Sequence, residues 1–298
     1  LTGAVVNDGL ITAPDGVSLL GQQVLNSGSI LAEHGLVTLS AGEEVYIAEE
    51  DSGIVLRVDN LDASTGRGLA PTDPEATGAG VVNEGAVTGS DVIFSCGDVY
   101  SLAVVNSGSV TAHGGSVTLS GNADVVNKGL IDVSSQTGLG GSASLLGNRV
   151  VMQGGSIDAS GAIGGGTVLL GGNFQGSGEE RQAAVTFVDA DSMIDADATA
   201  AGDGGTVIVW ADGKTAFYGS LSARGGAEGG AGGLAEVSGS ELLNFIGVAD
   251  LFGADSLGTL LLDPTNIIVA TGGGAAYTDV NAFDAGGADE TIAPATLD

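Results

Sequence analysis

The chain of 298 residues contains 54 glycines, only 4% aromatic residues and a formal net charge of −30. With 37 acidic against 7 basic residues, it lacks the cationic surface that binding to nucleic acid or to an anionic bilayer requires. A hydrophobic content of 43% argues against a disordered acidic chain. No apolar run reaches the length of a membrane-spanning helix, so membrane insertion is not expected.

A short motif recurs along the first half of the chain. Its first copy is Val5-Val6-Asn7-Asp8-Gly9, and later copies keep two apolar residues, an asparagine and a glycine two positions later. Most successive copies are about 20 residues apart, the length of one turn of a β-solenoid. The wider gap between the second and third copies is expected to hold further coils. The motif asparagines and glycines are Asn7, Asn26, Asn83, Asn106, Asn127, Gly9, Gly28, Gly85, Gly108 and Gly129.

A second type of segment follows the motifs and carries apolar side chains at alternate positions, which predicts strands with one buried face. These segments are residues 17–19, 37–39, 92–94 and 117–119. In the wide gap, the sequence near 66–80 contains Pro71 and Pro74 and interrupts the pattern. We therefore expect a loop insertion there.

The sequence of the repeat changes in the second half of the chain. Segments such as Ile131-Asp132-Val133-Ser134 are followed by a glycine-rich turn and then by a new apolar strand, as in residues 166–170. Residues near 173–182, with Phe174 and the cluster Glu179-Glu180-Arg181, break the pattern. They predict a second insertion, because insertions in solenoids project as loops.

Beyond Pro264 the repeat fades. One apolar segment, Ile267-Ile268-Val269, is expected to form a strand, and the sequence to Asp298 is acidic, glycine-rich and free of lysine and arginine. We therefore divide the chain into a repeat domain, 1–264, and a terminal strand with an acidic glycine-rich linker, 265–298.

These patterns predict an all-β fold, a right-handed parallel β-helix of roughly a dozen coils of about 19 to 27 residues with loop insertions. The glycine of each motif is expected to supply the positive φ angle of a tight corner. The asparagines, one per coil, are expected to stack and to hydrogen-bond from turn to turn.

The most distinctive run extends from Gly204 to Gly219 and reads GGTVIVWADGKTAFYG. It is followed by Ser222-Ala223-Arg224-Gly225-Gly226, by Glu236-Val237-Ser238-Gly239 and by Gly258-Thr259-Leu260-Leu261-Leu262-Asp263-Pro264. In these segments the chain resembles large exoproteins of the filamentous haemagglutinin family, and the resemblance covers nearly the whole chain to Pro264.

The resemblance implies a right-handed β-helix, export by two-partner secretion with an outer-membrane transporter as partner, and adhesion or a related surface function. It implies a secreted protein, extracellular or at the cell surface of a Gram-negative-type bacterium, with a surface glycan or a receptor on a host or neighbouring cell as a candidate ligand. The family's secretion domain carries an Asn-Pro-Asn-Gly-Ile type motif, which this sequence lacks. We therefore expect this segment to lie downstream of that domain.

Parallel β-helices also include enzymes that cleave polysaccharides, so carboxylate clusters are candidate catalytic groups. Asp189, Asp191, Asp195 and Asp197 alternate along one segment and could place two carboxylates on one face. The only basic residue close to them in sequence is Arg181. We assign no catalytic residue and no cofactor, and we expect the chain not to be an enzyme.

The same four aspartates are candidates for Ca²⁺, because hard cations prefer several oxygen ligands. The sequence has neither a calcium-binding nonapeptide repeat nor an EF-hand loop, so solvation of an acidic surface is the favoured interpretation. His34 and His113 fall at equivalent turns several coils apart, and Cys96 is the lone cysteine. No zinc site is predicted from so few ligands.

The sequence therefore favours a structural and adhesive stalk segment of a large secreted bacterial surface exoprotein, which mediates attachment or displays distal domains. Two alternatives stay open. One is a β-helical polysaccharide hydrolase or lyase, and the other is the scaffold of a delivered toxin whose active domain lies outside this chain.

Overall fold

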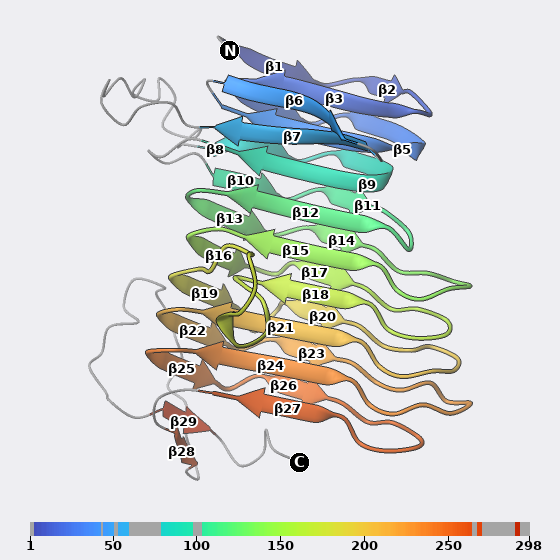
Figure 1. Ribbon diagram of the computed structural model, residues 1–298, viewed down its shortest axis with the longest axis vertical. Helices are drawn as coiled ribbons and strands as arrows, with labels where there is room; N and C mark the ends of the chain where they lie inside the picture. The colour runs from blue at the N-terminus through green and yellow to red at the C-terminus, as the bar shows by residue number, and fades with distance from the viewer. Residues whose placement is uncertain are drawn as a thin grey trace.

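The computed structural model describes residues 3–42, 44–50, 53–59, 79–97, 103–263, 267–269 and 290–292. Parallel strands stack along one long axis, from β1 (Ala4–Asn7) near the N-terminus to β27 (Thr259–Leu262), as Figure 1 shows. Each coil contributes one strand to each of three faces, called here the first, second and third face. No helix within these ranges is long and apolar enough to cross a bilayer.

The first face is a nine-stranded parallel sheet. Equivalent residues pair across it, so that Asn7 lies beside Asn26 and Asn26 beside Asn83. Its strands are β1, β4 (Gln23–Asn26), β8 (Ala79–Asn83), β10 (Ala103–Asn106), β13 (Asp124–Asn127), β16 (Arg149–Met152), β19 (Val185–Val188), β22 (Lys214–Phe217) and β25 (Leu242–Phe245).

The second and third faces are joined, because β5 (Ser29–Ala41) and β9 (Ala86–Cys96) run through the corner between them. The other strands of the second face are β2 (Leu10–Thr12), β11 (Ser109–Thr111), β14 (Leu130–Asp132), β17 (Ser156–Asp158), β20 (Met193–Asp195), β23 (Ser220–Ser222) and β26 (Val248–Asp250). Those of the third face are β3 (Gly16–Gly21), β12 (Ser116–Gly121), β15 (Ser142–Leu146), β18 (Thr167–Leu170), β21 (Thr206–Ala211), β24 (Leu234–Gly239) and β27.

The predicted fold class, a parallel β-helix, is confirmed, but the described residues form nine coils and not roughly a dozen. The expected number was too high because further coils were placed between Asn26 and Asn83. These two residues are direct neighbours, although they are 57 positions apart in the sequence. The later coils that join Val188 to Phe217 and Phe217 to Phe245 exceed the expected length of about 27 residues.

Between its second and third coils the chain leaves the stack. It forms an antiparallel pair, β6 (Glu44–Glu50) and β7 (Gly53–Asp59), and rejoins the first face at β8. Most of the insertion expected near 66–80 lies outside the described residues, and its last two residues, Ala79 and Gly80, belong to β8.

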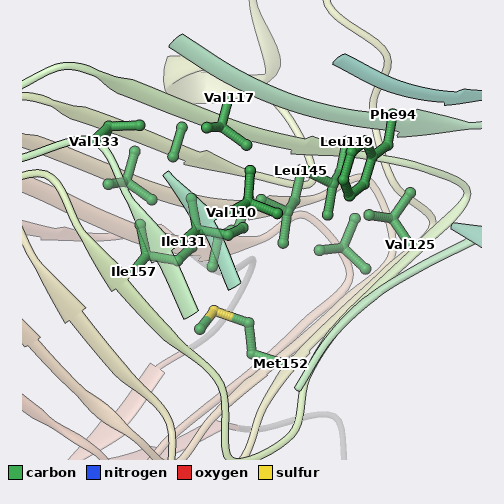
Figure 2. Close-up of a cluster of buried hydrophobic side chains, with 14 of the residues drawn as sticks. Phe94, Val110, Val117, Leu119, Val125, Ile131, Val133, Leu145, Met152 and Ile157 are labelled. Atoms are coloured by element: carbon green, nitrogen blue, oxygen red, sulfur yellow. The ribbon is translucent and has the colours of Figure 1, made fainter. Parts of the chain in front are cut away.

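The core is made of apolar side chains that stack on the same position of the next coil. Val110, Ile131 and Ile157 pair in successive strands of the second face and are at most 1% exposed. Figure 2 shows them facing Val117 and Leu145, which come from the third face. Because each layer contacts only the layers above and below, the hydrophobic stabilisation accumulates coil by coil.

The five motif asparagines form a continuous ladder at one corner of the core. The side-chain amides of Asn7, Asn26, Asn83 and Asn106 each donate to Oδ1 of the next asparagine, at 2.7, 2.7, 2.8 and 2.8 Å respectively. At the end of the ladder, Asn127 Nδ2 donates to Gly129 O at 3.1 Å. Every member is therefore hydrogen-bonded, as a buried polar group requires.

The same column continues in apolar residues. Met152, Val188, Phe217 and Phe245 follow Asn127 in register. The rings of Phe217 and Phe245 are stacked, with centroids 5.5 Å apart and an interplanar angle of 13°. The column therefore changes from a polar ladder to an apolar stack within one continuous sheet.

The motif glycines have a different role from the one expected. None of the five has a positive φ angle, so the expectation of a left-handed corner was wrong. A Cβ on Gly108 would instead lie 2.0 Å from the carbonyl oxygen of Gly85 in the preceding coil, and Gly129 has the same clearance from Gly108. Glycine is required here because successive coils pack backbone against backbone.

The predicted strand 267–269 is present as β28 (Ile267–Val269). It pairs in parallel with β29 (Glu290–Ile292), which falls in the segment expected to be a linker. The other residues of that segment lie outside the described ranges.

Candidate functional site

The insertion near 173–182 folds back onto the stack. Its neck is closed by the Ala183 N–H, which donates to Gly171 O at 2.6 Å. Its first turn is η1 (Phe174–Gly176), capped by Asn173 Oδ1, which accepts from the Phe174 N–H at 2.7 Å. In Figure 1 this segment, residues 172–182, crosses the third face in front of β18 and β21, and we call it the cover loop.

Trp210, the single tryptophan of the chain, lies on β21 beneath the cover loop and is 8% exposed. Its indole N–H donates to Asp212 Oδ1 at 3.2 Å. A Cβ on Gly176 would lie 2.6 Å from Cζ2 of the indole, so the loop backbone rests directly on the ring. The loop therefore buries a large aromatic side chain on the outer surface of the helix.

Glu236 is also covered. It occupies an outward position of β24, between the core residues Ala235 and Val237, yet it is 0% exposed. Its Oε2 accepts the Gln175 N–H at 2.9 Å. Gln175 has a φ of 52° and is the one non-glycine residue with positive φ in the described ranges, a conformation that costs about 1–3 kcal/mol. The Glu236 carboxyl thus secures a strained residue of the cover loop.

The second carboxyl oxygen, Glu236 Oε1, is buried and makes no hydrogen bond of acceptable geometry. The same is true of Ser238 Oγ on the same strand and of Gln182 Oε1 at the end of the cover loop. Burial raises the pKa of Glu236, and the negative charge of Asp263 raises it further. The hydrogen bond from the Gln175 N–H and the nearby Ser238 hydroxyl lower the pKa, but they offset the effect of burial only in part. This corner of the third face is the least satisfied polar site among the described residues.

Sequence reasoning did not identify Trp210 or Glu236 as site residues. Both stand at strand positions whose alternation predicts contact with solvent, and the resemblance used them only as markers of the family. The available signal was the insertion itself, because a loop that returns to the stack can bury side chains on an outer face.

The four aspartates considered as Ca²⁺ ligands have separate roles. Asp189 Oδ1 accepts from the Gly154 N–H at 3.0 Å, Asp195 Oδ1 accepts from the Asp197 N–H at 2.8 Å, and Asp191 is exposed. Within the ranges that the structure describes, no group of three or more His, Cys, Asp or Glu side chains is arranged to hold a metal ion. Their arrangement therefore adds no support for Ca²⁺ binding.

Asp195 belongs to a column of acidic side chains at the end of the second face. Asp132, Asp158 and Asp195 pair in successive coils, and each accepts the backbone N–H two residues ahead. Burial raises the pKa of Asp195, and the negative charges of the Asp197 and Asp158 side chains raise it further. The hydrogen bond from the Asp197 backbone N–H has the opposite effect and lowers the pKa. The Ile-Asp segments of the second half thus encode a turn at this corner.

Arg224 places a positive charge beside this column. Its Nε–H donates to Asp197 Oδ2 at 2.9 Å, and its Nη1 lies 3.5 Å from Asp250 Oδ2. Arg181, the basic residue close to these aspartates in the sequence, instead donates to Asn122 Oδ1 at 2.7 Å. The expectation that Arg181 was the nearby basic residue was wrong, because the solenoid brings Arg224 to Asp197 from the next coil.

Replacing Arg224 with glutamine is expected to lower the free energy of unfolding by less than about 1 kcal/mol. The side chain is 52% exposed, so water screens its charge. Urea denaturation at low and high salt checks this, and the difference from wild type should shrink as salt increases. Arg181→Gln is the matched control. A loss of several kcal/mol would mean that the acidic column depends on this one cation.

The two histidines lie on different coils. His34 is within β5, and His113 follows β11 with its Nδ1 3.5 Å from Asp132 Oδ1. Cys96, at the end of β9, is a buried thiol.

The sequence matches no protein-family model and no curated protein. Among solved structures, the fold is similar to the crystal structure of the HMW1 secretion domain from Haemophilus influenzae, with a TM-score of 0.67 and 26% sequence identity. The match covers 87% of this chain and 66% of that chain, so this chain spans less than two thirds of the solved structure. That the segment lies downstream of a secretion domain stays a prediction. The match confirms the resemblance of this chain to two-partner secretion exoproteins of the filamentous haemagglutinin type.

Proposed function

We propose that the chain is a structural and adhesive stalk segment of a large exoprotein that a bacterium exports by two-partner secretion. The observation that supports this most is the similarity to the HMW1 secretion domain over 87% of the chain. The continuous first face of nine paired strands adds to it, because such a stack forms a stiff rod. Its role is geometric: the rod carries loops or distal domains away from the cell.

The proposed export partner is an outer-membrane transporter, and the proposed location is the medium or the outer surface of a Gram-negative-type bacterium. The fold suits export of an extended chain, because each coil pairs with its neighbours and can be added as the chain emerges. A formal charge of −30 keeps such rods soluble and apart from one another. The proposed ligand is a surface glycan or a receptor on a host or neighbouring cell.

A polysaccharide hydrolase or lyase is the first alternative, and we propose that the chain is not an enzyme. The supporting observation is that Asp195 and Asp197, the best candidate carboxylates, are occupied in a turn and in a contact with Arg224. The second alternative is the scaffold of a delivered toxin. It shares every feature of the stalk within these residues and differs only in what the parent protein carries.

A glycan-array screen of the purified chain, with Ca²⁺ and with a chelator, tests the adhesive function. We expect binding to a restricted glycan class without the appearance of new reducing ends. Thermally unfolded chain is the control for binding through charge alone. New reducing ends that disappear in an Asp195→Asn, Asp197→Asn double variant would establish the enzyme instead. No binding to any glycan or to cells would contradict the adhesive part and leave a passive stalk.

A further inference from the structure

Two buried oxygen atoms beneath the cover loop lack well-formed hydrogen bonds. They are Glu236 Oε1 and Ser238 Oγ, on residues i and i+2 of β24, which point to the same side of the sheet. Both residues are 0% exposed. An ionised carboxylate can only accept hydrogen bonds, whereas a protonated carboxyl also donates one, and a serine hydroxyl can do either. A proton on Glu236 would therefore give both oxygen atoms a partner.

The reverse arrangement, in which the Ser238 hydroxyl donates to an ionised Glu236, leaves a buried negative charge. The charge that acts on the carboxyl of Glu236 comes from Asp263, which is itself negative. Removing an unpaired carboxylate from water is unfavourable, so such a group takes up a proton instead. The protonated form is the one that fits a closed loop.

We propose that Glu236 is protonated when the cover loop is closed, with Oε1–H donating to Ser238 Oγ and Oε2 accepting the Gln175 N–H, and that loss of this proton to bulk water opens the loop. The loop is then a latch that responds to pH. An uncharged carboxyl accepts the Gln175 N–H and holds Gln175 in its strained conformation. For a charged carboxyl, the free energy of hydration in the open loop is more favourable than the contacts made under the closed loop.

The charged groups around Glu236 favour the same direction. Asp263, which follows β27, is negative and acts on Glu236 through space. The acidic residues of the cover loop, Glu179 and Glu180, are exposed, and Arg181 is engaged with Asn122. Asp212, directly after β21, is also acidic, and it accepts from the Trp210 indole N–H. Of these groups, four are acidic and the one cation, Arg181, is engaged elsewhere, so they favour an uncharged Glu236.

The sign of the pH effect follows from linkage. In the open loop Glu236 is an ordinary solvated carboxyl, and burial under the closed loop raises its pKa. Between these two pKa values the closed form binds more protons than the open form. The ratio of closed to open loop is therefore highest at acid pH and falls by up to about tenfold per pH unit through this window.

Trp210 reports on the loop directly, because it is the chain's single tryptophan and lies under Gly176. The experiment is acrylamide quenching of its fluorescence in the intact chain from pH 4 to pH 9. We expect the quenching constant to rise and the emission to shift to longer wavelength as pH increases, while the β-sheet circular dichroism signal stays constant.

Glu236→Gln is the decisive variant. Glutamine keeps an oxygen for the Gln175 N–H and an N–H₂ donor for Ser238, so it mimics the protonated acid and should stay closed across the whole range. Glu241→Gln, at an exposed turn after the same strand, is the control and should titrate like wild type. Quenching independent of pH in the wild-type chain, or a Glu236→Gln variant that titrates like wild type, would overturn the proposal.

Discussion

Replacing Asn106 with leucine is expected to lower the free energy of unfolding by about 2–5 kcal/mol. Asn106 is an interior member of the asparagine ladder, accepting from Asn83 and donating to Asn127 at 2.8 Å in each case. Leucine breaks both bonds and leaves the amide of one neighbour and the carbonyl of the other without their buried partner. Urea denaturation, read at constant slope, measures the loss.

Asn7→Leu is the matched control, because Asn7 stands at the end of the ladder and makes a single bond to another asparagine. Its loss should be about half as large or less. Asn127→Met should also be milder than Asn106→Leu, since methionine continues the column as Met152 does one coil later. Equal losses at Asn7 and Asn106 would mean that the ladder contributes nothing beyond the volume it fills.

Gly108→Ala is expected to lower the free energy of unfolding by about 4 kcal/mol or more. The new Cβ would lie 2.0 Å from Gly85 O, and backbone cannot move aside as a side chain can. Separating the coils enough to admit the methyl group would break the flanking bonds, in which the Gly108 N–H donates to Asn83 O at 3.0 Å and the Ser109 N–H to Gly85 O at 2.9 Å.

Gly9→Ala tests this explanation. Gly9 has the same place in the motif, but the nearest atom to its added Cβ is Asn7 Oδ1 at 4.0 Å. Its free energy of unfolding should stay within about 0.5 kcal/mol of wild type. Soluble yield and the urea midpoint distinguish the two variants. If both alanines destabilise equally, local backbone conformation and not coil packing selects glycine.

The fold could be predicted because its signals are local and repeated. Each motif contains its own apolar positions, asparagine and glycine, so five copies specify a stack without any knowledge of distant contacts. The number of coils could not be predicted, because no pattern in the sequence between Asn26 and Asn83 indicates that these two residues belong to adjacent coils. The sequence also did not reveal that the asparagine column continues through Phe217 and Phe245, because apolar residues replace the asparagine that identifies the column in earlier coils.

The role of the motif glycines could not be predicted for a different reason. A glycine two positions after an asparagine is compatible both with a left-handed turn and with a close backbone approach. Only the stacked structure distinguishes the two, since the clash at Gly108 comes from another coil. Glu236 and Trp210 were missed for a related reason. Strand alternation predicts which side of the sheet a residue faces, but not whether a loop returns to cover it.

The direct pairing of β4 with β8 has a consequence for how such proteins diverge. The hydrogen bond from Asn26 to Asn83 holds the register whatever the length of chain between them. Doubling the length of a flexible excursion costs only about 0.6 kcal/mol in closure entropy. An insertion between Gly42 and Ala79 can therefore lengthen or shorten at little cost in free energy, while the register of the two coils that flank it stays the same.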